Sequence, residues 1–255
     1  MNPVLTIKLK NNMKALYIFP HPDDESFGPA PAMSKQRREG NEVYLLTLTK
    51  GGATKQRHKY GYSIDEMGEV RYKEMLDVAK VLNLSGMTVL DLPDSGLKEM
   101  DPRDIERILM DEIEKIKPDV IVTYAVHGIS GFHDHLVTHA VVKRVYAEMK
   151  NNSDYLKRLA FFTITEEAAL MQKHFHINGS KDEEIDCIYE VDEEDMEKSR
   201  KALDCYVTFK ETIDASNIKD QIPKKVCFEI FQETYKPKLK NLFEKYKTKN
   251  NGQIK

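Results

Sequence analysis

Residues 15–25 read ALYIFPHPDDE and give the clearest indication of the fold. The five apolar residues at the start predict a buried β-strand. Pro20 and Pro22 end that strand, because proline cannot donate a hydrogen bond to a sheet. The stretch that follows has the length of a helix, and Gly40 stands where a glycine commonly closes one. A strand that leads directly into a helix is typical of α/β proteins.

Apolar runs and amphipathic stretches continue to alternate along the chain. We expect further strands at residues 43–48, 88–92, 120–124 and 159–164, and helices at residues 69–82, 103–116, 136–149 and 195–209. The first helix, residues 26–39, contains Pro29 and Pro31, which predict an irregular start. The alternation predicts an α/β fold with a mainly parallel sheet flanked by helices.

The chain has 255 residues, enough for one sizeable core, and shows neither an internal repeat nor a clear linker. We therefore expect a single domain over residues 14–235. Residues 1–13 would be an N-terminal extension, and the Lys-rich composition of residues 236–255 favours a disordered tail. Residues 50–68 are polar and rich in glycine, and they predict a long surface loop of the kind that often serves function.

Composition restricts the partners and the setting of the protein. The net charge of -3 gives no support for nucleic-acid binding. No apolar run approaches the roughly 20 residues of a transmembrane helix, and residues 1–13 lack the order of a secretory signal. Cys187, Cys205 and Cys227 are odd in number and widely spaced, which indicates reduced thiols. We expect a cytoplasmic protein that binds neither nucleic acid nor membrane.

His21 and Asp24 are candidate metal ligands at the end of the first strand. The carboxyl ends of strands are where open α/β sheets place their sites. An imidazole and a carboxylate three residues apart suit Zn²⁺, and the neighbouring Asp23 could take a proton from a water that the metal activates. A purely structural interpretation also exists, because Pro and acidic residues are common at helix starts.

Residues 127–139 read HGISGFHDHLVTH and follow the strand at 120–124. They hold four of the eight histidines of the chain. A second strand end brings this cluster beside the first, so a third ligand from it would complete a catalytic site with an open position for water. A spare histidine and Asp134 could supply an oxyanion-stabilising cation and the partner that orients it.

The two motifs together resemble those of the LmbE-like, or PIG-L, zinc-dependent de-N-acetylases. The first motif, His21-Pro22-Asp23-Asp24-Glu25, is the more specific, and an Asp-His pair before a helix follows it as in the family. The resemblance covers roughly residues 14–210. Weaker matches fall in the family's order at Leu48-Thr49-Lys50-Gly51-Gly52, Arg71 with Glu74, Asp94, and Lys201-Ala202-Leu203 with Cys205.

The resemblance implies a Rossmann-like fold and the removal of acetyl groups from N-acetylglucosaminyl small molecules. It assigns the metal to His21, Asp24 and His135. It makes Asp23 the general base, and directs Arg71 and Asp94 toward the sugar of the substrate. Zinc is the expected metal, although Fe²⁺ also suits two histidines and one aspartate. Members of the family often form oligomers, so a homo-oligomer is a further expectation.

One position departs from the family pattern. The family has a histidine three residues before the zinc-binding histidine, where this chain has Phe132. Three alternatives follow: His133 stabilises the oxyanion, His127 does so from further back, or the activity is weakened. We favour His133, steadied by Asp134. His139 lies one helical turn beyond the zinc-binding histidine and is interpreted as a residue that supports a ligand or packs in the core, rather than as a ligand itself.

Two other functions fit the same residues. An amidase that cleaves a larger sugar-amide conjugate would use the same site, and the loop at residues 50–68 would set what fits. A non-catalytic module that binds a metal or a sugar is the second alternative. A nucleotide-binding protein is disfavoured, because no GxGxxG motif follows the first strand.

Overall fold

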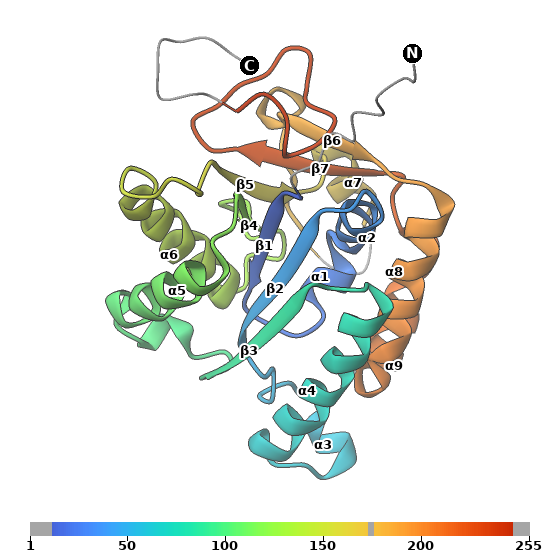
Figure 1. Cartoon of the computed structure of the whole chain (residues 1–255). Helices are drawn as coiled ribbons and strands as arrows, with labels where there is room; N and C mark the ends of the chain where they lie inside the picture. Colours follow the sequence, from blue (N-terminus) through green and yellow to red (C-terminus); the bar gives the residue numbers. More distant parts are fainter. Residues whose placement is uncertain (1–11, 173–175, 247–255) are drawn as a thin grey trace, which may run out of the picture.

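The computed structural model describes residues 12–172 and 176–246, and it consists of a central sheet with helices on both faces (Figure 1). Within these residues the sheet has seven strands in the order β3-β2-β1-β4-β5-β7-β6. The strands from β3 to β5 in this order are parallel, whereas β7 and β6 are antiparallel additions at one edge. The bounds are β1 Lys14–Phe19, β2 Glu42–Thr49, β3 Gly86–Leu92, β4 Val120–Tyr124, β5 Arg158–Thr163, β6 Cys187–Glu190 and β7 Lys225–Ile230.

Helices α5 and α6 cover one face of the sheet, and α2, α4 and α8 cover the other (Figure 1). The helix bounds are α1 Asp24–Phe27, α2 Ala30–Arg38, α3 Arg57–Tyr60, α4 Ile64–Val81, α5 Pro102–Ile116, α6 His133–Met149, α7 Glu166–Met171, α8 Glu193–Cys205 and α9 Lys210–Ser216. Short 3₁₀ helices occupy Leu97–Glu99, Asp182–Glu184, Val207–Phe209 and Ile218–Gln221. The predicted α/β fold with a mainly parallel sheet is confirmed.

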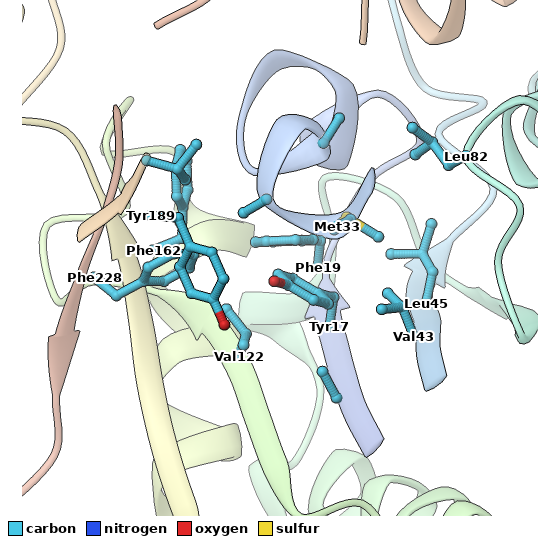
Figure 2. Packing of buried hydrophobic residues seen from close by; sticks show 14 of the residues in the cluster. Tyr17, Phe19, Met33, Val43, Leu45, Leu82, Val122, Phe162, Tyr189 and Phe228 are labelled. Carbon is cyan, nitrogen blue, oxygen red and sulfur yellow. The ribbon is translucent and has the colours of Figure 1, made fainter. Parts of the chain in front are cut away.

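The two faces of β1 contribute to two separate parts of the core. Tyr17 and Phe19 point to the side of α2, where Figure 2 shows them near Met33. Leu16 and Ile18 point to the side of α5 and α6. All four strand side chains are fully buried, which explains why the first strand is continuously apolar rather than alternating.

The helix predicted over residues 26–39 is divided into α1 and α2. Gly28 and Pro29 separate the two helices. A side chain at Gly28 would lie 2.7 Å from the ring of Phe162, so glycine is needed for the close approach of this turn to β5. Pro31 falls in the first turn of α2, where its missing N–H costs nothing. The irregular start expected from the prolines is therefore present.

The prediction of a loop over residues 50–68 was wrong. Helix α3 lies inside this range, and α4 begins at Ile64, five residues before the predicted start. The cause is a capping box: the Ser63 hydroxyl accepts the Glu66 N–H at 3.2 Å, and the Glu66 carboxylate accepts the Ser63 N–H at 2.8 Å. Helix α6 also begins three residues earlier than predicted, at His133.

The C-terminal part of the described chain packs onto the antiparallel edge. Buried Arg158 pairs with Glu233 at 2.9 Å and donates to the Leu242 carbonyl at 2.6 Å. Leu239 and Leu242 are buried, so residues up to 246 of the expected tail contact the core. Residues 247–255 of that tail and residues 1–11 of the expected extension lie outside the described residues. The boundary at residue 235 stays a prediction.

Two smaller expectations can be compared with the described residues. No helix among them combines the length and the apolar composition that spanning a membrane requires. The three cysteines are free, with Cys187 and Cys227 buried and Cys205 half-buried.

Candidate functional site

The candidate site lies where the central strands β1 and β4 end side by side. The chain moves from β1 outward to β2 and β3, and then returns to β4 on the other side of β1. This reversal is the topological switch point at which α/β sheets form ligand sites. His21 and Asp24 follow β1, whereas His135 lies in the first turn of α6 after β4. The two predicted motifs are therefore brought together.

His21, Asp24 and His135 form a group that could hold a metal ion. One ligand atom from each residue lies within 4.8 Å of the other two. The Nε2 atom of His135 is 3.4 Å from Oδ1 of Asp24, and Nδ1 of His21 is 3.6 Å from Oδ2 of Asp24. Asp24 and His135 are each 6% exposed, so the space between their donor atoms is largely shielded from solvent.

The orientation of His135 is fixed by its second ring nitrogen. Its Nδ1 donates to the carbonyl of Gly128 at 2.8 Å, so that Nε2 is left with a free lone pair on the side of Asp24. The imidazole stacks on the ring of Tyr124 at 4.4 Å, and the Tyr124 hydroxyl donates to Asp24 at 2.7 Å. Gly128 has a φ of 61°, and a side chain there would lie 2.8 Å from the Cβ of His135.

His21 is held in the same manner by Asp134. The Nε2 atom of His21 lies 3.1 Å from the Asp134 carboxylate, which also accepts the backbone N–H groups of Ser95 and Leu97. This arrangement leaves Nδ1 of His21 on the side of Asp24. Both histidines thus turn a ring nitrogen toward one carboxylate, and with His21 deprotonated the donor set fits a divalent cation such as Zn²⁺.

Asp134 was expected to orient His133, but its carboxylate contacts other groups. Among the described residues no hydrogen bond joins the two side chains, and the Asp134 carboxylate is buried between His21 and the backbone. Asp94 also approaches His21, at 3.4 Å from Nε2. Asp94 and Asp134 therefore surround the outer nitrogen of His21 with negative charge.

Asp23 lies next to the ligand group in an unusual backbone conformation. Its φ is 89°, a left-handed value that a non-glycine residue adopts at a cost. Arg71 holds it there, with Nη2 2.6 Å from the Asp23 carboxylate and 2.7 Å from the carbonyl of Pro22. A strained residue that its surroundings constrain in this way is typical of active sites.

Arg71 is not placed as the sequence analysis had expected. Its side chain is 3% exposed, and its guanidinium also donates to the Gly51 carbonyl and lies 4.0 Å from the ring centre of Phe209. A guanidinium enclosed in this way contacts Asp23 and its neighbours rather than an open surface. The residue therefore supports the turn that carries Asp23.

The electrostatics separate the two adjacent aspartates. Burial opposes charge on Asp24, yet His135 and His21 outweigh it and lower the pKa of Asp24 to about 2. Burial raises the pKa of Asp23 to about 7, although Arg71 opposes this effect. Burial would lower the pKa of His21, but Asp134 and Asp24 raise it to about 10. The group thus favours positive charge beside Asp24, and the two neighbouring aspartates differ in how readily they hold a proton.

The remaining histidines of the second motif have separate surroundings. His133 is exposed at the first residue of α6. His127 accepts the Ile129 N–H through Nδ1 at 3.0 Å, and its Nε2 lies 3.3 Å from the Ser180 hydroxyl, so both nitrogens are engaged. Burial lowers the pKa of His127.

Two further aromatic contacts concern this motif. His139 is buried, donates to the Tyr124 carbonyl at 2.9 Å and packs 4.7 Å from Phe161, which agrees with its interpretation as a packing residue. Phe132, at the position that departs from the family pattern, is 65% exposed and lies edge-on to His135. Tyr124 was not predicted as a site residue. The sequence feature that could have identified Tyr124 is its position as the last residue of a predicted buried strand.

Comparison with known proteins identifies the family of the chain. The family described as PIG-L, GlcNAc-PI de-N-acetylase, matches residues 16–146. A 1D-myo-inositol 2-acetamido-2-deoxy-alpha-D-glucopyranoside deacetylase from Thermomonospora curvata is 30% identical in an alignment 152 positions long, which covers 51% of this chain and 51% of that protein. A mycothiol S-conjugate amidase from Streptomyces coelicolor is 29% identical in an alignment 165 positions long, which covers 58% of this chain and 56% of that protein. The chain thus spans little more than half of these relatives.

Among solved structures, the A40926 pseudoaglycone deacetylase Dbv21 superposes with a TM-score of 0.66. The superposition covers 88% of this chain and 100% of that protein. Sequence identity is 17%, so this likeness concerns the fold alone.

Proposed function

The chain belongs to the PIG-L, or LmbE-like, family, and we propose that it is a metal-dependent hydrolase that removes the N-acetyl group from a small N-acetylglucosamine derivative. The observation that carries the proposal is the convergence of His21, Asp24 and His135 next to the strained Asp23. Three ligands with an open side are the pattern of catalytic rather than structural metal sites. Names given to relatives support the acetylated amino sugar as the substrate class.

His21, Asp24 and His135 would hold the metal, with zinc as the proposed ion and Fe²⁺ as the alternative that the same donors accept. When bound, such an ion polarises the amide carbonyl and acidifies a water. The buried carboxylate of Asp24, with its lowered pKa, supplies the negative ligand. Asp134 and the Gly128 carbonyl hold the two imidazoles in position.

Asp23 is the proposed general base. It accepts a proton from the attacking water, whose oxygen bonds to the carbonyl carbon of the acetamide. The C–N bond then breaks, and the proton passes from Asp23 to the departing nitrogen, so acetate and a free amine result. Arg71 keeps the Asp23 carboxylate in place through its 2.6 Å contact, and we propose this positioning role for it in place of a contact with the sugar.

His133 is the proposed donor to the developing oxyanion. It stands two residues before His135 at the start of α6, and its exposure leaves it free to reach substrate. His127 is less suited, because both its nitrogens are already engaged. The N-terminal end of α6 adds a partial positive charge on the same side. Asp94 is the proposed contact for the sugar hydroxyls.

A second candidate function has one observation in its favour. The Streptomyces coelicolor relative is described as an amidase, and the same residues could cleave a larger acyl group from an amino sugar. The reaction would differ only in the acid that leaves. We place either activity in the cytoplasm, because the three cysteines are free in the described chain.

We predict that zinc-loaded protein releases acetate and a primary amine from N-acetylglucosamine derivatives. Chelation should abolish acetate release, and added Zn²⁺ should restore it, because the metal polarises the amide. Ion chromatography of acetate, run beside an amine assay, makes the measurement. Release of a longer acid from acyl conjugates, without acetate release, would favour the amidase. A metal-bound protein that cleaves neither kind of substrate would contradict both candidates.

Replacing the general base should leave the metal in place and remove turnover. We expect Asp23→Asn to bind zinc as wild type and to lose about 10²–10⁴ in kcat, since the amide cannot take a proton from water. Asp104→Asn, on the exposed face of α5, is the matched control and should keep full activity. Wild-type kcat in Asp23→Asn would remove the base assignment.

Two histidine variants separate the candidates for the oxyanion donor. We expect His133→Ala to lose about 10²–10³ in kcat with little change in KM or zinc content, the usual cost of losing one such donor. His127→Ala should keep its kcat, because that side chain bonds within the fold. Steady-state kinetics on one acetylated substrate make the comparison. The reverse result would transfer the role to His127.

A further inference from the structure

A pocket of about 410 Å³ opens beside the candidate metal centre. Its walls come from the residues after β2, the first two turns of α4 and the end of β3. Part of this wall is the segment that the sequence analysis had expected to be a loop and that instead forms the start of α4. The volume is that of a pocket for a small organic ligand.

Asp94 connects this pocket to the metal centre. It lines the pocket, and its Oδ1 lies 3.4 Å from Nε2 of His21. Its other oxygen accepts the Ala53 N–H at 2.6 Å, which fixes the side chain between the two spaces. A substrate whose acetamide lay at the metal centre would therefore have room past Asp94, in the pocket, for its sugar and the group attached to it.

The charged side chains of the pocket are mostly acidic. Four carboxylates, from Asp65, Glu69, Asp91 and Asp94, face one ammonium, from Lys50. Lys50 is already paired, with its Nζ 2.6 Å from Glu69 and 3.3 Å from Asp91. Lys50 thus links α4 and β3 across the pocket. Its positive charge is shared by Glu69 and Asp91 and does not neutralise the charges of Asp65 and Asp94. Hydroxyl and ammonium groups meet acceptors there, whereas an anion meets repulsion.

We propose that this pocket binds the group attached to the amino sugar and selects against anionic groups. On the proposed deacetylase function, the substrate then carries an uncharged hydroxylated or a cationic group at this position, and not a carboxylate or a phosphate. Specificity of this kind comes from a repulsive element as much as from attractive contacts. Asp65, Glu69 and Asp91 are the residues that set it.

The test uses three N-acetylglucosamine glycosides of equal size that differ in charge: 2-hydroxyethyl, 2-aminoethyl and carboxymethyl. At low ionic strength we expect kcat/KM for the carboxymethyl glycoside to be about tenfold below that for the 2-hydroxyethyl glycoside. This factor corresponds to about three net negative charges at roughly 8 Å in a water-like dielectric. The ratio should decrease as salt is added, because exposed charges are screened. A carboxymethyl glycoside that is used as well or better would overturn the proposal.

A charge-neutralising pair ties the effect to the pocket. Glu69→Gln with Asp91→Asn removes two carboxylates and releases Lys50. The ratio of kcat/KM for the 2-hydroxyethyl glycoside to that for the carboxymethyl glycoside should then fall below about threefold. The matched control, Asp111→Asn with Glu167→Gln, changes net charge equally on exposed positions of α5 and α7 and should keep the tenfold ratio. Equal discrimination in both double variants would show that the pocket does not cause it.

Binding separates this proposal from the deacetylase proposal. The same three glycosides of glucosamine, which lack the acetyl group, are titrated by calorimetry, so no turnover is needed. Failure of all three acetylated compounds to release acetate would contradict the deacetylase function. Weaker binding of the carboxymethyl product would still support the pocket, and affinities that do not depend on the charge of the group would overturn it.

Discussion

The structure depends on the burial of β1 on both of its faces. A strand at the centre of a parallel sheet is apolar over its buried length, here Ala15 to Phe19, and the chain leaves the sheet before the next charged residue appears. Pro20 marks that point, so the polar residues that follow are concentrated at the carboxyl edge of the sheet. Because β4 is the parallel neighbour of β1, its own polar continuation reaches the same place. The site is thus a consequence of how two buried strands end.

Charge in this enclosed place is tolerated because each group has a partner. Buried carboxylates are costly unless they are paired or hydrogen-bonded. Asp24 contacts two histidines and Tyr124, Asp134 contacts His21 and two backbone amides, and Asp23 contacts Arg71. These contacts also turn one ring nitrogen of each histidine toward Asp24. The contacts that offset the cost of burying these charges therefore also arrange the group to bind a cation.

The sequence predicted the sheet and the meeting of the two motifs well, because both rest on short-range patterns. Apolar runs located the five parallel strands, and the HPDDE motif with its Asp-His partner identified three residues that the fold does bring together. It could not locate β6 and β7, since a short antiparallel addition leaves a weak pattern. The start of α4 was missed because the capping pair Ser63 and Glu66 was interpreted as part of a loop.

Side-chain roles were harder to predict than positions. Asp134 and Arg71 were both recognised as site residues, yet their partners, His21 and Asp23, lie more than 40 residues away in the chain. Only the packing of α4 and α6 against the strand ends decides which atoms meet. The same packing forms the acidic pocket beside Asp94, which no local motif indicates.

The most direct test of the account is an equilibrium zinc titration against a chromophoric chelator. Wild-type protein should bind one ion per chain at this centre, and His135→Ala should lose that high-affinity binding. Asp134→Asn should bind about 10–100-fold more weakly, as is usual when the partner of a metal-binding histidine is removed. Undiminished affinity in His135→Ala would contradict the assignment of the metal centre, and an unchanged Asp134→Asn would contradict the role of Asp134 in holding His21.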